Sequence, residues 1–257
     1  MLRFGVISIM PHMFQALHEG VTGRAIAAGI ASVDHWNPRD WARTPHRAVD
    51  DKPYGGGPGM VMMYEPLHAA IQSARKQLPA TCQTVYLSPQ GRQIKQADLN
   101  RVASAHQPLL FIAGRYEGID ERIITQDVDD EWSLGDFVLS GGELAAMVFI
   151  DAIIRLLPGS LGDPGSAMQD SFMTGLLDHP HYTRPAHVNG CDVPSVLLGG
   201  NHRDIDCWRR KQALGKTWLK RPDLLDKLPL NQMDKQLLVE FKHEHGAPHD
   251  TGNRFEE

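Results

Sequence analysis

The sequence contains few cysteines and no long apolar run. Cys82, Cys191 and Cys207 are the three cysteines among 257 residues, and they lie far apart with no Cys-x-x-Cys spacing. This excludes a disulfide framework or a zinc knuckle and favours a reducing, cytoplasmic environment. Residues 2–9 are too short an apolar segment for a signal-peptide core, and residues 144–157 are interrupted by charge, so we expect no membrane partner.

Strong charge of one sign is also absent from the chain as a whole. The formal net charge is −5, with 42% hydrophobic and 22% charged residues, which is typical of a globular protein and excludes a uniformly basic nucleic-acid coat. Residues 203–221 differ, because seven cations there outnumber two carboxylates and give a net charge of +5. With Trp208 and Trp218 interleaved, this segment fits either a solvated helix face or a contact with RNA.

Three common ligand motifs are missing. The glycine-rich residues 54–59 are not followed by Gly-Lys-Ser/Thr, which excludes a nucleoside-triphosphate P-loop, and no Gly-x-Gly-x-x-Gly follows an expected strand. His243-Glu244-His245 lacks the spacing of a His-Glu-x-x-His zinc site, and His179-Pro180-His181 is better explained as loop structure. We therefore expect no metal site from these histidines.

Short apolar runs that end in Gly- or Pro-containing loops indicate β-strands. They lie at residues 2–9, 85–87, 109–113 and 137–139. Between them, residues 67–78 and 99–106 place apolar side chains three and four positions apart, which predicts amphipathic helices. This alternation predicts an α/β domain with a mostly parallel sheet, whose ligands bind in the loops after the strands.

A further helix is expected from Gly141, because Ser140 and Glu143 have the spacing of a capping box. Its sequence is apolar on every side, which predicts that it is buried. Asp151 and Arg155 lie four residues apart within it. They fit either a simple ion pair or a buried arginine that faces an anionic centre.

The composition of residues 158–175 changes to Gly, Ser, Pro and Asp, which is typical of a linker or a functional loop. Beyond it the chain has the capping and stop signals of short helices. We therefore expect an α/β domain over residues 1–160, a flexible linker over residues 161–175, a smaller and mainly helical domain over residues 176–246, and a polar tail over residues 247–257.

Several long motifs occur in order along most of the chain. They are DDKPYGGGPGM at residues 50–60, LSPQG at 87–91, GRYEGIDER at 114–122, SLGDFVLSGGE at 133–143, DSF at 170–172, GLLDHPHYTRP at 175–185 and LGGNH at 198–202. Together they resemble the bacterial tRNA (guanine-N1)-methyltransferase family, TrmD, over about residues 6–244. Leu134 and Phe137 depart from the family's Ile and Tyr, which changes packing against a ligand more than chemistry.

The resemblance implies a fold and an activity. The fold is an α/β domain with a C-terminal trefoil knot, of the SPOUT class, in a homodimer with each active site at the interface. The activity is transfer of a methyl group from S-adenosylmethionine to N1 of guanosine 37 in tRNA, next to the anticodon, and Mg²⁺ is a candidate second cofactor. Two alternatives stay open: a ribose 2′-O-methyltransferase of the same knotted class, and a noncatalytic RNA-binding protein.

The resemblance also implies roles for single residues. Asp170 corresponds to the general base that removes the N1 proton, because guanine N1 is a poor nucleophile until that proton leaves. Arg155 corresponds to a buried cation that stabilises charge on guanine O6, which replaces the simple ion pair as the preferred interpretation. Pro58 and Gly59 correspond to positions near the target base.

Two larger sets of contacts are expected. The tRNA backbone is expected to contact the basic segment through Arg203, Arg209, Arg210 and Lys211. The cofactor is expected to contact Leu87, Ser88, Pro89, Gly114, Tyr116, Glu117, Leu134, Gly135, Asp136, Phe137, Val138, Leu139 and Gly141. Among these residues, the glycines allow close approach of the backbone to adenine and ribose.

Overall fold

The chain divides into two compact units, Met1–Pro164 and Gly165–Glu257. The computed structural model describes residues 1–246, so the tail expected at residues 247–257 lies outside the described part of the chain. Within the described part, no helix is both long and apolar enough to cross a membrane.

The first unit is built on a five-stranded sheet in which all neighbouring strands are parallel, in the order β2-β1-β6-β5-β7. The strands are β1 (Leu2–Ile7), β2 (Ala31–Trp36), β5 (Gln83–Gln93), β6 (Leu109–Ile112) and β7 (Asp130–Ser133). This confirms the predicted α/β class with a mostly parallel sheet. Strands β2 and β7 fall outside the apolar runs that predict strands.

The strand predicted at residues 137–139 is wrong. Phe137, Val138 and Leu139 are 55%, 83% and 38% exposed and lie in the loop after β7. The strand at this edge is β7 itself, whose sequence Asp-Glu-Trp-Ser contains no apolar run. An edge strand needs few apolar residues, and here only Trp132 and Ser133 are buried.

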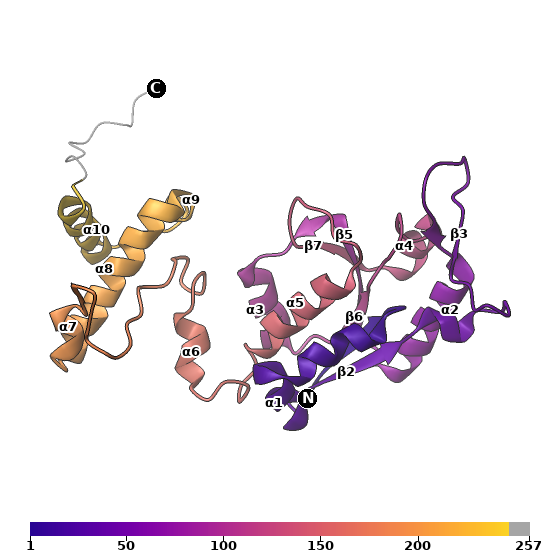
Figure 1. Cartoon of the computed structure of the whole chain (residues 1–257), viewed down its shortest axis with the longest axis horizontal. Coiled ribbons are helices and arrows are strands. Elements are labelled where there is room, and N and C mark those ends of the chain that lie inside the picture. Colours follow the sequence, from indigo (N-terminus) through magenta and orange to yellow (C-terminus); the bar gives the residue numbers. More distant parts are fainter. Residues whose placement is uncertain (247–257) are drawn as a thin grey trace. The chain divides into compact units, whose positions relative to one another are not determined.

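Helices cover both faces of the sheet (Figure 1). Along β1, Leu2, Phe4 and Val6 point to one face and Ile7 to the other, as the two-residue period of a strand requires. The first face packs against η1 (Pro11–His18), α1 (Gly20–Ala27), α3 (Gln96–Ala105) and α5 (Glu143–Ile154). The opposite face packs against η2 (Pro38–Trp41), α2 (Tyr64–Gln77) and α4 (Glu121–Asp127).

The periodicity predictions are confirmed for α2 and α3 but fail in part for α5. Helix α5 begins at Glu143 rather than Gly141, and no side chain caps its first turn, so the predicted capping box is wrong. The helix is also not buried on every side, because Leu144 is 45% and Val148 is 49% exposed. An exposed apolar stripe therefore runs along α5.

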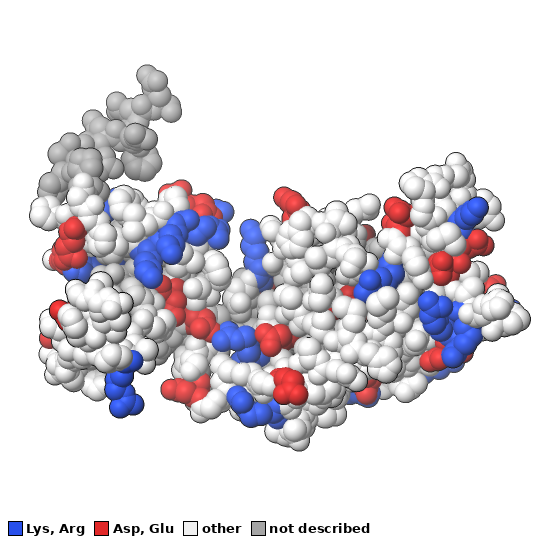
Figure 2. Space-filling model, in the orientation of Figure 1, with Lys and Arg blue, Asp and Glu red and all other residues white. Residues whose placement is uncertain are grey.

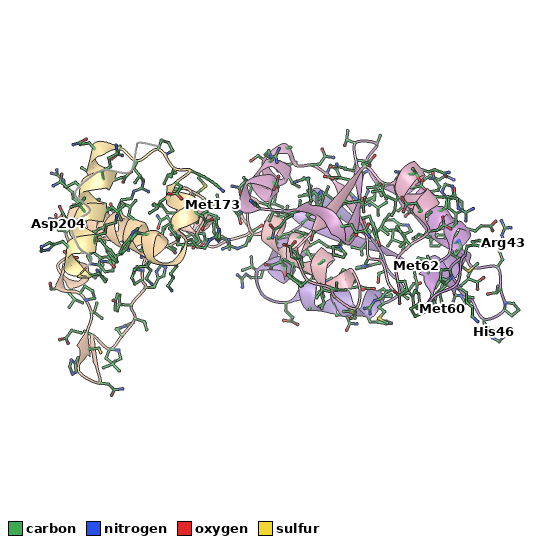
Figure 3. The ribbon with its side chains drawn as sticks, turned by 90° about the horizontal axis from the view of Figure 1, so that it is seen from above. Arg43, His46, Met60, Met62, Met173 and Asp204 are labelled. Carbon is green, nitrogen blue, oxygen red and sulfur yellow. The ribbon has the colours of Figure 1, made fainter. Side chains whose placement is uncertain are left out.

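A two-stranded hairpin, β3 (Asp50–Asp51) and β4 (Val61–Met62), projects a glycine-rich loop from the first unit. Figure 3 shows Arg43 and His46 at the outer end of the segment that precedes β3, whereas Met62 lies inward. Met62 is 1% exposed and belongs to the core against α2. The hairpin is thus anchored at its base and free of the core at its tip, where Tyr54 is fully exposed.

The second unit is mainly helical. Its elements are α6 (Pro164–Gln169), which begins at the boundary, β8 (His187–Val188), β9 (Cys191–Asp192), α7 (Ser195–Leu198), α8 (His202–Lys220), α9 (Pro222–Leu225) and α10 (Gln232–Glu244). Its small core contains Leu176, Leu214 and Leu237. Asn201 and Asn231 cap α8 and α10 by accepting hydrogen bonds from backbone N–H groups of the first turn.

Candidate active site

A pocket forms at the carboxyl ends of β6 and β7, beside the part of β5 where its register with β7 shifts after Leu87. Val85 pairs with Phe111 and Leu87 with Trp132, so these parts of the three strands lie side by side. The pocket is lined by residues 86–89, 114–118, 132–135 and 137–142, together with Ala145. Parallel α/β sheets bind ligands at this edge, because the strands deliver loops and free backbone groups there.

The structure brings nearly all of the expected cofactor contacts together in this pocket. Those that line it are Leu87, Ser88, Pro89, Gly114, Tyr116, Glu117, Leu134, Gly135, Phe137, Val138, Leu139 and Gly141. Asp136 is exposed and is not part of the lining. The lining comes from separate segments between residues 86 and 145, so their convergence is a property of the fold. Their role as cofactor contacts stays a prediction.

The backbone of the pocket is held by a close approach at Gly142. The N–H of Gly142 donates to the carbonyl oxygen of Gly114 at 2.9 Å. A Cβ atom at Gly142 would lie 2.7 Å from the Cα of Ala113, which is closer than any real Cβ contact. Only glycine therefore lets the loop after β7 lie against the loop after β6.

A buried ion pair ties the pocket loops to the sheet. The carboxylate of Glu143, which is fully buried, accepts hydrogen bonds from Ser8 Oγ and from Arg115 Nε, both at 2.8 Å. Arg115 also donates to the carbonyl oxygen of Ser140 at 3.2 Å. This bond network explains why Glu143 does not cap α5. The sequence did not predict the Arg115–Glu143 pair, because no local pattern links two residues that lie in separate elements.

Burial raises the pKa of both tyrosines that line the pocket. Burial raises the pKa of Tyr86 to about 12, so its hydroxyl keeps its proton at neutral pH and can donate a hydrogen bond. Burial, followed by a hydrogen bond to Asp50, also raises the pKa of Tyr116. Tyr116 has a φ of 62°, a left-handed conformation that non-glycine residues adopt at constrained sites.

The glycine-rich loop between β3 and β4 reaches one wall of the pocket. The N–H of Glu117 donates to the carbonyl oxygen of Met60 at 2.9 Å. A Cβ atom at Gly59 would lie 2.3 Å from Oε1 of Glu117, so the two residues are in contact. The structure thus brings Gly59, an expected neighbour of the target base, next to Glu117, an expected cofactor contact. Pro58 is exposed beside them.

The two expected catalytic residues lie on different units. Arg155 follows the last turn of α5 in the first unit, and Asp170 follows α6 in the second. Arg155 is partly buried within this chain, and its role stays a prediction.

The basic segment forms most of α8, and its cations differ in their partners. Figure 2 shows Lys and Arg side chains gathered along the end of α8 that leads into α9. Arg210 donates twice to the buried carboxylate of Asp234, at 2.7 and 2.9 Å, and Lys211 pairs with Glu244 at 2.7 Å. Arg209 lies 3.7 Å from Asp206. Arg203 is exposed and has no carboxylate partner within residues 1–246.

Comparisons with known proteins identify the family of this chain. Residues 2–227 match the model of the family described as tRNA (Guanine-1)-methyltransferase TrmD. Three relatives are called tRNA (guanine-N(1)-)-methyltransferase. The protein of Legionella pneumophila strain Philadelphia 1 is 70% identical over 95% of this chain and 98% of its own. Those of Nitrosococcus oceani and Photobacterium profundum are 58% and 55% identical, over 96% and 95% of this chain and 98% of their own. The chain therefore belongs to the TrmD family of tRNA (guanine-1)-methyltransferases.

Proposed function

We propose that this protein transfers a methyl group from S-adenosylmethionine to N1 of guanosine 37 in tRNA, giving 1-methylguanosine. The observation that carries the proposal is the pocket at the carboxyl ends of β6 and β7 beside β5, in a chain of this family. Twelve of the thirteen positions expected to contact the cofactor line that pocket.

The residues of the pocket suit S-adenosylmethionine, which supplies an electrophilic methyl group. Leu87, Pro89, Leu134 and Val138 provide apolar walls for the adenine ring. The carboxylate of Glu117 can accept hydrogen bonds from ribose hydroxyls or an ammonium group. The donor hydroxyl of Tyr86 and the backbone groups around Gly114 complete the polar contacts.

The reaction requires a proton acceptor at guanine N1. We assign that role to the carboxylate of Asp170, which takes the N1 proton while N1 forms its bond to the methyl carbon and the bond from that carbon to sulfur breaks. As the proton leaves, negative charge develops on guanine O6, where the guanidinium of Arg155 stabilises it until N1 gains the methyl group and the base is neutral again. S-adenosylhomocysteine and the methylated base are the products.

The proposal extends to fold and assembly. The loops at 86–89, 114–118 and 137–142 would form the trefoil knot, which is consistent with the close approach of Gly142 to Ala113. A homodimer would cover the apolar stripe of α5, where Leu144 and Val148 are about half exposed. The active site would lie at that interface.

A transfer assay tests the proposed function. Tritiated S-adenosylmethionine is incubated with tRNA transcripts that carry either guanosine or adenosine at position 37, and the product is digested and identified by mass spectrometry. We expect 1-methylguanosine from the guanosine transcript alone. A 2′-O-methylated nucleoside would favour the ribose methyltransferase, and no transfer would favour the noncatalytic RNA-binding protein. Replacing Mg²⁺ by EDTA in the same assay tests a metal requirement.

A further inference from the structure

Three metal-ligating side chains meet in the second unit, in a segment that the pocket does not use. Donor atoms of Asp178, His179 and His181 all lie within 4.8 Å of one another. His181 Nε2 lies 2.9 Å from Asp178 Oδ2, and His179 Nε2 lies 3.7 Å from Asp178 Oδ1. Within residues 1–246, this is the one place where three such groups come together.

The spacing of these atoms suits a small divalent ion. Zinc binds imidazole nitrogen and carboxylate oxygen at about 2.0–2.2 Å in a tetrahedron, which places neighbouring donor atoms about 3.3–3.6 Å apart. The distances of 2.9 and 3.7 Å bracket that value. Because all three donor atoms lie within 4.8 Å of one another, side-chain shifts of about 1 Å would bring the carboxylate and both imidazoles to bonding distance of one ion.

His179 is held in the form that can bind a metal. Its Nδ1 lies 3.1 Å from the carbonyl oxygen of Pro180, which can only accept a hydrogen bond, so Nδ1 carries the proton. The lone pair is then on Nε2, the atom that faces Asp178. Fixing one ring nitrogen on a backbone carbonyl is the usual support of metal-binding histidines. The side chain is 13% exposed and lies beside the ring of Trp208.

A second His–Asp pair in the same unit shows what a simple ion pair looks like. His187 Nδ1 lies 2.7 Å from Asp192 Oδ1, with both side chains well exposed. No third donor joins that pair within the described residues. The cluster at Asp178 differs in having a second imidazole, and two of its three side chains, Asp178 and His179, are less exposed than those of the pair.

We propose that Asp178, His179 and His181 bind one divalent transition-metal ion of the zinc class, with a fourth position open to water. This replaces the expectation that His179-Pro180-His181 forms only loop structure. Two imidazoles favour zinc-class ions over Mg²⁺, which prefers oxygen ligands. The N–H of Asp178 donates to Ser171 Oγ at 3.0 Å, so an ion here would also fix the segment that follows Asp170.

Titration of the full-length, untagged chain with Co²⁺ tests the site. Protein stripped with EDTA is titrated with Co²⁺, whose visible absorption reports coordination by protein ligands, and Zn²⁺ is then added to displace it. We expect one equivalent to bind, displacement by Zn²⁺, and no displacement by Mg²⁺ at millimolar concentration. Failure to bind, or displacement by Mg²⁺, would overturn the proposal.

Variants locate the binding. His181→Ala removes a ligand whose side chain is 70% exposed, so the fold should survive, which circular dichroism checks. We expect its Co²⁺ affinity to fall at least tenfold, and Asp178→Asn to behave similarly. His187→Ala is the matched control, because it breaks the other His–Asp pair and should leave affinity unchanged. Equal affinity in His181→Ala and the unmodified chain would place the metal elsewhere and refute the assignment.

Discussion

The two units of this protein depend on different kinds of structure. The first has two large apolar cores on either side of a parallel sheet, and its pocket is formed largely by backbone in tightly packed loops. The second has a small core of three buried leucines and is held together by charged pairs such as Arg210–Asp234. We therefore expect the first unit to be sensitive to atoms added where two backbone segments are in close contact. The second unit should be sensitive to the loss of single charged side chains.

The largest effect is expected at Asp170, a charged group of the second unit. Asp170→Asn keeps the size of the side chain but cannot accept the N1 proton, so turnover should fall by about 10²–10⁴-fold. Affinity for S-adenosylmethionine, measured by calorimetry, should stay the same because the pocket lies in the first unit. Asp163→Asn, in the same segment, is the control and should keep its turnover. A parallel loss of cofactor affinity would contradict the assignment of Asp170 as the base.

The next largest effect is expected from adding one methyl group to the first unit. Gly142→Ala would push a Cβ to 2.7 Å from the backbone of Ala113 and separate the two pocket loops. Overpacking of this kind costs about 1–3 kcal/mol, so the dissociation constant for S-adenosylmethionine should rise about 5- to 150-fold. Gly162→Ala is the matched control, because its Cβ would meet nothing within 4 Å. Unchanged affinity in Gly142→Ala would show that the pocket does not depend on this contact.

A smaller effect, dependent on pH, is expected at Asp234. The hydrogen bond from Arg210 lowers the pKa of Asp234 despite its burial. The ionised pair therefore stabilises the fold above the unfolded pKa of about 3.9, and that stability is lost as the pH falls through the lower folded pKa. Asp234→Asn should lower the free energy of unfolding by about 2 kcal/mol at pH 7. The difference from the unmodified chain should shrink at pH 3.

Urea unfolding at the two pH values measures this difference. The control is Asp223→Asn, which breaks the exposed pair with Arg221 and should have a smaller effect at both pH values. If Asp234→Asn unfolds like the unmodified chain at pH 7, the second unit does not depend on its charged pairs, and the contrast with the first unit fails.

The fold class was predictable because it follows from local periodicity. The spacing of apolar residues in α2 and α3 and the runs in β1, β5 and β6 are visible in the sequence. Strand β7 was not, because an edge strand with one buried tryptophan has no repeating apolar pattern. A knot could not be predicted from periodicity at all, since it is a property of how the chain is threaded.

The candidate site was predictable only where long motifs carry it. Twelve residues predicted from those motifs line one pocket. Predictions made from charge and spacing alone were wrong for single residues. Glu143 has the spacing of a capping residue but bonds to Ser8, 135 positions away. Arg210 belongs to a basic run but pairs with Asp234 on another helix. Contacts made by tertiary structure override local patterns in both cases.

The smallest effect is expected at Arg203. This prediction distinguishes cations that are available to bind RNA from cations that stabilise the second unit through ion pairs. Arg210 and Lys211 are engaged by carboxylates, whereas Arg203 is exposed with no such partner within residues 1–246. Arg203→Gln should weaken tRNA binding a few-fold and reduce the slope of log affinity against log salt by about 1, since one phosphate contact is lost. Arg24→Gln removes an exposed cation from the first unit and should leave the slope unchanged. Filter binding at several salt concentrations measures the affinity and the slope for both variants. An unchanged slope in Arg203→Gln would mean that the N-terminal turn of α8 is solvent-exposed and does not contact tRNA.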